Sequence, residues 1–351
     1  MELHELKIGK KTARIPIIQG GMGVGVSRSK LAGAVAKEGG VGIISSAQIG
    51  YDEPDFETDV CGCNLRAIEK HVALAKQQAD GGLVGVNVMV ALQHYEDHVK
   101  AAVRAGADLV VCGAGLPVDL PRLVQNADTA IAPIVSTKKA ASVLLRMWDK
   151  KYQRTADLLI VEGPKAGGHL GFSKEQLAQI SDASYDQEIQ AIIREKRIYE
   201  QKYGRSIPVV VGGGIFDRTD IEHVMALGAD GVQMATRFVA TKECDASPAY
   251  KQAYIQAKEE DIVIIKSPVG MPGRAIRNAW LENVQQGNAP VQKCLHCIKN
   301  CNPKEIPYCI TQALIHAVNG NLDQGLIFCG TNAGRIKELT TDSELLRELT
   351  A

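Results

Sequence analysis

Continuous runs of apolar residues alternate along the chain with longer segments in which apolar residues recur every three or four positions. Continuous runs are typical of parallel strands buried on both faces, and the longer period is that of amphipathic helices. Eight strands are predicted, at residues 15–19, 41–45, 83–90, 108–112, 132–136, 157–161, 207–211 and 231–234. Helices are predicted between them, the first at residues 27–38 with Ser27 as its N-cap and with Gly39 and Gly40 ending it.

This rhythm predicts the fold class. Eight strand–helix units within about 240 residues favour an α/β protein with a closed (β/α)8 TIM barrel, and a doubly wound open sheet is the alternative. The rhythm ends after Phe238. We therefore expect a barrel over residues 1–244, a small, mostly helical cap with a four-cysteine site over 245–310, and a C-terminal helical segment, 311–351, that packs on the barrel.

Composition narrows the functional classes. The chain of 351 residues has 40 basic and 40 acidic side chains, and this balance favours neither nucleic acid nor an anionic membrane surface. No apolar run reaches the roughly 18 residues of a transmembrane helix, and the N-terminus lacks the apolar core of a secretory signal. We therefore expect a cytoplasmic protein without a nucleic-acid or membrane partner, in which the nine cysteines are reduced.

Small residues follow three of the predicted strands. A glycine-rich turn at residues 20–25 follows the first strand, three glycines at 212–214 close the seventh, and residues 235–236 follow the eighth. In (β/α)8 barrels the loops after the seventh and eighth strands commonly bind phosphate through backbone N–H groups. The pattern therefore predicts a phosphorylated ligand at the carboxyl ends of the strands, with simple tight turns as the alternative.

His169 follows the sixth predicted strand, directly after Gly167 and Gly168. An imidazole exchanges protons near neutral pH, and catalytic groups lie at the carboxyl ends of barrel strands. A lone histidine is more often structural or merely exposed, but this position favours function. We predict that His169 is a catalytic acid or base.

Four cysteines are clustered within 16 residues: Cys294, Cys297, Cys301 and Cys309. They match the ligand count of a [4Fe-4S] cluster or of an all-thiolate zinc site, and their spacing differs from the paired knuckles of a zinc ribbon. We favour iron–sulfur over zinc, with unligated thiols as the third alternative, and we interpret His296 as a neighbour rather than a ligand. The other cysteines are interpreted as buried or incidental thiols: Cys61, Cys63, Cys112, Cys244 and Cys329.

Four motifs, IPIIQGGMGVG, VEGPKAGGHLG, IPVVVGGGIFDR and GADGVQMATRF, occur in this order. With them, nearly the whole chain resembles the superfamily of FMN barrels that contains nitronate monooxygenases (2-nitropropane dioxygenases) and FabK-type enoyl-ACP reductases. The four-cysteine segment is most similar to the FabX-type acyl-ACP dehydrogenase/isomerase branch, which implies FMN together with a [4Fe-4S] cluster. Lys165 departs from the acidic residue that is frequent in the reductases and monooxygenases.

The resemblance implies a role for each site residue. The flavin ring would be lined or hydrogen-bonded by Gly20, Gly21, Met22, Gly23 and Asn87. Other parts of FMN would lie beside Glu162 and Gly168, and its phosphate would be held by Gly213, Gly214, Ala235 and Thr236. His169 matches the catalytic histidine of the superfamily, and the four clustered cysteines match the cluster ligands.

Two enzymatic hypotheses follow. In the first, an FMN-dependent oxidoreductase of fatty acid biosynthesis acts on the CH–CH group of a thioester bound to acyl carrier protein, with His169 moving the proton and flavin N5 the hydride. In the second, a nitronate monooxygenase oxidises a small alkyl nitronate. A third hypothesis is a non-catalytic barrel that senses flavin or iron–sulfur status. Lys266, Arg274 and Arg277 are candidates for contacting the acidic carrier, with solvated surface charge as the alternative, and the oligomeric state stays open, a homodimer included.

Overall fold

The computed structural model describes residues 2–287, 289, 291 and 293–351. Eight parallel strands form a closed barrel, in the order β3 (Ile17–Gln19), β4 (Val41–Ser45), β5 (Leu83–Met89), β6 (Leu109–Gly113), β7 (Ala130–Val135), β8 (Leu159–Glu162), β10 (Val209–Gly212) and β11 (Gly231–Met234). Strand β11 pairs with β3, so the sheet has no free edge. Each predicted strand overlaps one of these, which confirms the TIM barrel and shows that the open sheet was wrong.

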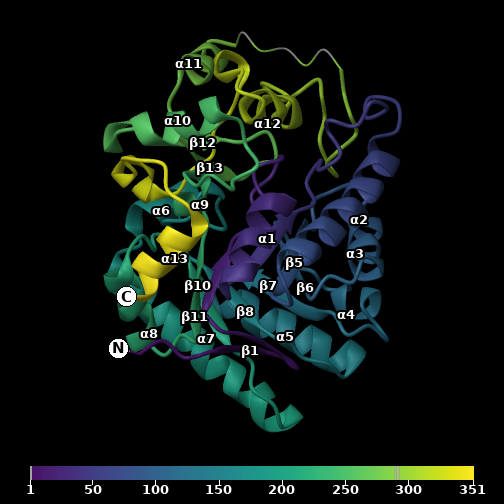
Figure 1. The fold of residues 1–351 in the computed structure, drawn as a ribbon, viewed down its shortest axis with the longest axis vertical. Coiled ribbons are helices and arrows are strands. Elements are labelled where there is room, and N and C mark those ends of the chain that lie inside the picture. Colours follow the sequence, from purple (N-terminus) through teal and green to yellow (C-terminus); the bar gives the residue numbers. More distant parts are fainter. Residues whose placement is uncertain (1, 288, 290, 292) are drawn as a thin grey trace.

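Helices surround the barrel (Figure 1). They are α1 (Ser29–Glu38), α2 (Val60–Gln78), α3 (Tyr95–Arg104), α4 (Leu120–Leu123), α5 (Lys138–Tyr152), α6 (Lys174–Gln179), α7 (Asp182–Tyr203), α8 (Arg218–Ala226), α9 (Thr236–Val239) and α13 (Asp342–Thr350). The C-terminal helix α13 packs on α1 and α8. Within the described chain, no helix is both long enough and apolar enough to cross a membrane.

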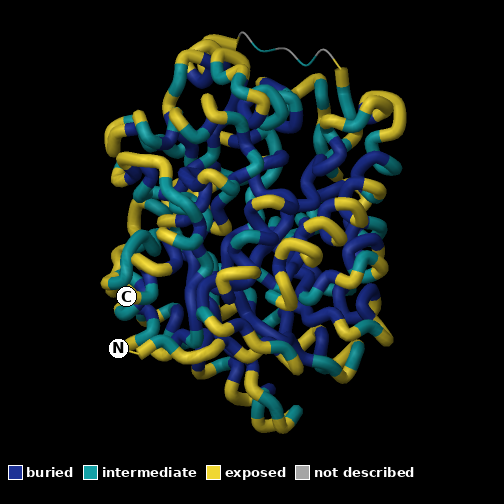
Figure 2. Tube along the Cα trace, in the orientation of Figure 1, coloured by how far each residue is buried: buried dark blue, intermediate teal, exposed yellow. Residues whose placement is uncertain are grey.

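Two layers of buried side chains hold the barrel together. Figure 2 shows that the buried residues are concentrated in the centre of the molecule. One layer lies between the strands and the surrounding helices, and the other fills the barrel itself. The hairpin of β1 (Leu6–Ile8) and β2 (Lys11–Ala13) contributes Leu6 and Ile8 to the interior layer. These side chains fill the amino end of the barrel, and the cavity described below lies at the carboxyl end.

The start of α1 differs from the prediction. Ser27 does not cap this helix, because its hydroxyl accepts a hydrogen bond from the Met22 backbone N–H at 2.7 Å and thereby closes the glycine-rich turn. The acceptor at the N-terminus of α1 comes instead from Asp245, whose carboxylate accepts hydrogen bonds from the N–H groups of Arg28 at 2.8 Å and Leu31 at 3.2 Å. A residue more than 200 positions away along the chain thus supplies the acceptor that the helix terminus needs.

A cap covers the carboxyl end of the barrel, at the top of Figure 1. It contains α10 (Pro248–Gln256), the short 3-10 helices η1 (Glu259–Asp261) and η2 (Leu322–Gln324), α11 (Ala279–Gln285) and α12 (Ile310–Val318). The expectation of a mostly helical cap missed a three-stranded antiparallel sheet, in which β13 (Pro272–Ile276) lies between β12 (Ile262–Lys266) and β9 (Gly168–His169). Strands β9 and β13 are short and contain Gly or Pro at their start, so they lack a clear strand pattern, whereas the apolar run of β12 (IVIIK) was overlooked. Strand β9 belongs to the loop after β8, and the sheet therefore joins the cap to the barrel.

Candidate active site

One cavity of about 260 Å³ lies at the carboxyl ends of the barrel strands. The residues proposed from the sequence to bind FMN or to act on substrate all line it: Gly20, Gly21, Met22, Gly23, Asn87, Glu162, Gly168, His169, Gly213, Gly214, Ala235 and Thr236. They come from five different strand ends and are brought together only by closure of the barrel. Their individual roles stay predictions, but the structure places them where one ligand can touch them all.

The turn after β3 forms one wall of this cavity. Gln19, buried inside the barrel, donates from Nε2 to the Gly20 carbonyl at 2.5 Å and accepts from the Ile43 N–H at 3.1 Å, so it fixes the path of the turn. A Cβ on Gly21 would lie 2.5 Å from the Cβ of Asn87. Only glycine therefore allows the turn to pack against Asn87 and leaves a flat backbone surface facing the cavity.

The opposite end of the cavity is rich in free backbone donors. Gly213 and Gly214 have φ values of +97° and +88°, which glycine adopts without steric cost. Their N–H groups donate no hydrogen bond within the described chain, and Thr236 begins the short helix α9, where N–H groups also lack partners. Such a group of unpaired donors fits an anionic phosphate, so the residues present suit the phosphate end of FMN.

The C-terminal segment closes this end, which the sequence did not indicate. Gly330 donates its N–H to Thr236 Oγ1 at 3.0 Å, and Asn332 Nδ2 donates to the Gly214 carbonyl at 2.7 Å. Both residues flank or lie in the 3-10 helix η3 (Thr331–Arg335). Their sequence pattern resembles any polar turn, so no local signal marks them as part of the site.

His169 is held by the cap sheet. Its backbone pairs with Gly273 of β13, and its Nε2 shares a hydrogen bond of 2.7 Å with Ser267 Oγ. The imidazole also packs edge-on against Phe328, with ring centroids 5.0 Å apart. Burial lowers the pKa of His169 from 6.5 to about 4, so the ring is neutral at physiological pH. The sequence identified His169 but missed Ser267 and Phe328, which orient it.

Glu162 ends β8 and faces the same cavity. Burial raises the pKa of its carboxyl from 4.5 to about 7, and no side-chain hydrogen bond of Glu162 is found within the described residues. The nearby Lys165 does not neutralise it, because its ammonium pairs with Asp182 at 2.7 Å. A half-buried carboxyl that faces the cavity without a partner in the described chain fits a polar group of a ligand.

Arg274 of β13, a candidate from the sequence for contacting an acidic carrier protein, makes its hydrogen bonds within the fold. Its guanidinium donates to the Pro164 carbonyl at 3.0 Å and to the Ala166 carbonyl, so it ties the loop after β8 to the cap. It is therefore committed to the interior and is not free for an acidic carrier protein. Lys266 and Arg277 are exposed on the cap.

The four clustered cysteines lie at the edge of the cap. The segment that carries them is attached to the loop after β5, because Gln93 donates its N–H to the Cys297 carbonyl at 3.1 Å. Thr311 Oγ1 donates to Cys297 Sγ at 3.0 Å, and Cys309 is the N-cap residue of α12. No three of the four sulfurs lie within 4.8 Å of one another. Burial and the neighbouring thiols together raise the pKa of Cys297 to about 11.

The profile of the nitronate monooxygenase family matches residues 4–351 of the chain. One relative is an octahydro-indene-carboxyl-CoA dehydrogenase of Mycobacterium tuberculosis, which is 28% identical over 78% of this chain and 66% of its own length. Another is a probable nitronate monooxygenase of Staphylococcus saprophyticus, which is 27% identical over 82% of each chain. The chain thus spans just under two thirds of the mycobacterial protein.

Solved structures show the same relationship. FabK from Thermotoga maritima superposes with a TM-score of 0.72 at 27% identity, over 95% of this chain and 91% of that one. A nitroalkane oxidase from Streptomyces ansochromogenes has the same fold, with a TM-score of 0.71 at 20% identity over 96% and 95% of the two chains. The chain therefore belongs to the nitronate monooxygenase family, whose members are FMN-dependent oxidoreductases.

Proposed function

We propose that this protein is an FMN-dependent oxidoreductase that acts on the CH–CH group of an acyl thioester, as an acyl-ACP dehydrogenase/isomerase or an enoyl-ACP reductase of fatty acid biosynthesis. The observation that carries the proposal is the neutral, half-buried imidazole of His169 in a cavity whose other walls include apolar side chains. These are Met89, Ile134, Leu314 and Phe328. An acyl chain has the chemistry to occupy such a surface.

Dehydrogenation of an acyl thioester removes a proton from C2 and a hydride from C3. When bound, FMN supplies the acceptor for the hydride. His169 is suited to take the proton, because a neutral imidazole is the basic form and a pKa of about 4 keeps it neutral at pH 7. Its Nε2 is engaged with Ser267, while Nδ1 has no hydrogen-bond partner within the described chain and is available to substrate.

The same base can also move a proton between C2 and C4 of the 2-enoyl product and so form the 3-enoyl isomer. This transfer needs no net redox change, and His169 receives and returns the same proton. A dehydrogenase and an isomerase activity therefore require one positioned imidazole rather than two.

FMN binding by the cavity is part of the proposal. The glycine-rich turn 20–23 and Asn87 would contact the flavin ring, and Glu162 and Gly168 would lie along the rest of the cofactor. The unpaired N–H groups of Gly213 and Gly214, with those at the start of α9, would hold the phosphate.

We further propose that Cys294, Cys297, Cys301 and Cys309 bind a [4Fe-4S] cluster. A tetrahedral zinc ion with Zn–S bonds of about 2.3 Å requires its sulfurs to lie about 3.8 Å apart. No three of these sulfurs lie within 4.8 Å of one another, so the described thiols are not arranged around a single zinc ion. The preference for iron–sulfur rests on the count and the spacing of the four cysteines along the sequence.

Nitronate monooxygenation is the second candidate. The family profile and the staphylococcal relative carry that name, and a neutral His169 would also serve to deprotonate a nitroalkane. The two candidates share the cofactor and the base, and they differ in their substrate and in the use of dioxygen.

Turnover assays with anaerobically purified protein separate these candidates. Decanoyl-ACP and crotonyl-ACP test the thioester reactions, and propionate 3-nitronate tests the monooxygenase, with His169→Asn as the control for each. Thioester turnover that is lost in His169→Asn supports the proposal. Oxidation of the nitronate without any thioester turnover refutes it. The absorption spectrum of the same sample shows whether a broad iron–sulfur shoulder near ~400 nm accompanies the flavin bands.

A further inference from the structure

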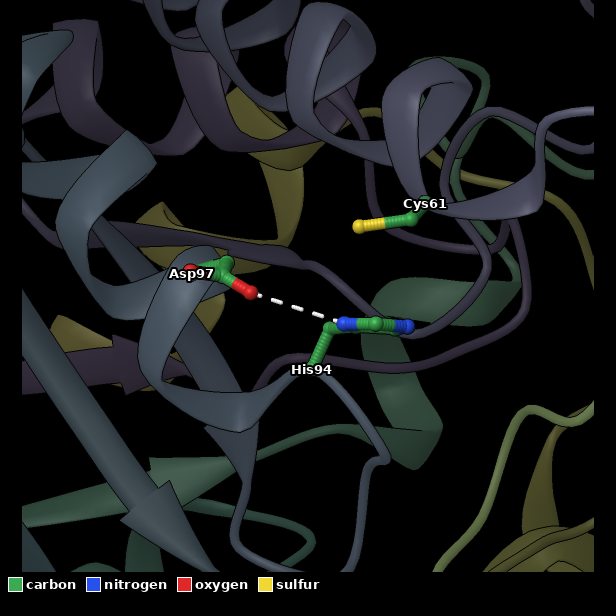
Figure 3. A group of neighbouring side chains, drawn as sticks. All are labelled: Cys61, His94 and Asp97. Atoms are coloured by element: carbon green, nitrogen blue, oxygen red, sulfur yellow. Dashed lines mark ion pairs between the residues drawn. The ribbon is translucent and has the colours of Figure 1, made fainter.

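Three potential metal ligands meet outside the active-site cavity, at the start of two neighbouring helices (Figure 3). Cys61 lies in the first turn of α2, His94 is the N-cap residue of α3, and Asp97 lies in the first turn of α3. One ligand atom of each, a sulfur, a ring nitrogen and a carboxylate oxygen, lies within 4.8 Å of the other two. Figure 3 shows the Cys61 sulfur directed toward the gap between the His94 ring and the Asp97 carboxylate.

The distances suit a small tetrahedral ion. Zinc binds imidazole nitrogen at about 2.0–2.1 Å and carboxylate oxygen at about 2.0–2.2 Å, so a tetrahedral angle places these two ligand atoms about 3.4 Å apart. His94 Nδ1 and Asp97 Oδ2 are 3.5 Å apart. Positions three apart on a helix face the same side, which explains why α3 presents both groups to Cys61.

A second feature of the same place also indicates a ligand. A cavity of about 240 Å³ is lined by Cys61 and His94 and also by His98, one turn farther along α3. His98 is only 2% exposed, and its Nδ1 is buried without a hydrogen-bond partner within the described chain. An unpaired buried nitrogen is costly unless a water or another group reaches it. A water bound to an ion at this site would be such a group.

The position of the cavity gives the site a structural consequence. The cysteine-bearing segment passes over it, because Leu92 and Ile298 form a β-bridge and Lys299 donates its N–H to the Ala91 carbonyl at 2.9 Å. His296 and Cys297 line the cavity from that side. An ion bound here would join α2 and α3 directly beneath the segment that carries Cys297.

We propose that Cys61, His94 and Asp97 form a mononuclear site for zinc or a similar divalent cation, distinct from the four-cysteine segment. The ion takes three protein ligands, and a water completes the tetrahedron, with His98 Nδ1 as its hydrogen-bond partner. On binding, the Cys61 thiol releases its proton to solvent and coordinates as the thiolate. The interpretation of Cys61 as an incidental thiol came from its sequence spacing, which says nothing of His94 and Asp97.

Protection of Cys61 from alkylation tests this site. The rate at which iodoacetamide modifies Cys61 is measured by peptide mass mapping, with and without zinc(II), in the full-length protein. The mapping reads Cys61 separately, so zinc bound at the four-cysteine segment does not interfere. Zinc is expected to slow modification of Cys61 at least about tenfold in the wild type, and His94→Ala and Asp97→Asn are each expected to weaken this protection at least about tenfold.

His223→Ala is the matched control. His223 Nε2 lies 3.1 Å from the Asp186 carboxylate on another face of the barrel. His223→Ala therefore removes a surface histidine that pairs with a carboxylate, as His94→Ala does, but far from Cys61. It should leave the protection of Cys61 unchanged. In equilibrium dialysis, Cys61→Ser should bind one zinc fewer per chain than the wild type. Zinc that leaves the wild-type rate unchanged, or that protects Cys61 equally in His94→Ala, overturns the proposal.

Discussion

Replacing Glu162 by glutamine should stabilise the flavin-free protein at alkaline pH. Burial in the cavity raises the pKa of this carboxyl from 4.5 to about 7, and Lys165 is paired with Asp182 instead of neutralising it. Below pH 4.5 the carboxyl is protonated in both the folded and the unfolded chain, so it costs no stability. Between pH 4.5 and 7 the Glu162 carboxyl ionises more readily in the unfolded chain than in the folded chain. The folded state therefore loses stability over this range, until the carboxyl is ionised in both states.

The magnitude follows from the pKa. At about 1.36 kcal/mol per pKa unit, raising it from 4.5 to about 7 corresponds to about 3 kcal/mol above pH 7. Water that enters the flavin-free cavity reduces this cost, so we expect Glu162→Gln to gain about 2 kcal/mol in the free energy of unfolding at pH 8 and close to nothing at pH 4.5. Urea denaturation of the flavin-free protein at both pH values measures the difference.

Glu200→Gln is a control of opposite sign. Burial alone would raise the pKa of Glu200, but hydrogen bonds from the Ile207 N–H at 2.7 Å and from Lys196 at 2.8 Å outweigh it, so the pKa is lowered. The stability that this carboxylate contributes is present above pH 4.5 and is lost as the pH falls through its lowered pKa. Glu200→Gln should therefore destabilise the protein at pH 8. A gain for Glu162→Gln that is equal at pH 4.5 and pH 8, or absent at pH 8, would refute the reasoning.

Four further outcomes are expected. His169→Asn should lower kcat by about 10²–10⁴-fold with the FMN content unchanged. Because the pKa of His169 is about 4, the kcat/KM of the wild type should fall only as the pH drops below about 5. A pH–rate profile of the wild type and the variant measures the two effects. Ser267→Ala removes the 2.7 Å hydrogen bond to His169 and should lower kcat about tenfold while KM stays constant in steady-state kinetics; an equal change in KM would contradict a positioning role. Gly213→Ala places a Cβ 2.9 Å from the Ala166 nitrogen at a backbone φ of +97°, so a flavin fluorescence titration should show at least about tenfold weaker FMN binding. Gly204→Ala is the control: at a φ of +60°, with no atom within 4 Å of the added Cβ, it should strain the backbone without changing FMN binding. Cys301→Ser should abolish the iron–sulfur absorption and leave the flavin bands, and an unchanged spectrum would exclude Cys301 as a ligand.

Much of the barrel could be predicted because its signals are local. A strand buried on both faces needs a continuous apolar run, and a turn that approaches a ligand closely needs glycine, so both are visible in a few consecutive residues. The strands at 41–45 and 231–234 begin and end as predicted. Gly213 and His169 were identified as site residues from their places after strands, and the barrel topology then required them to share one end.

What the sequence alone determined is thus the order of the elements and the residue types at the strand ends. The tertiary structure decided which distant groups complete them: Asp245 caps α1 in place of Ser27, Ser267 holds an imidazole 98 positions away, and Cys61 faces His94. Hydrophobic periodicity records which face of an element is buried but not which segment covers it. Hydrogen-bond partners and shared ligands between distant residues form only when the chain is folded, so no local pattern carries them.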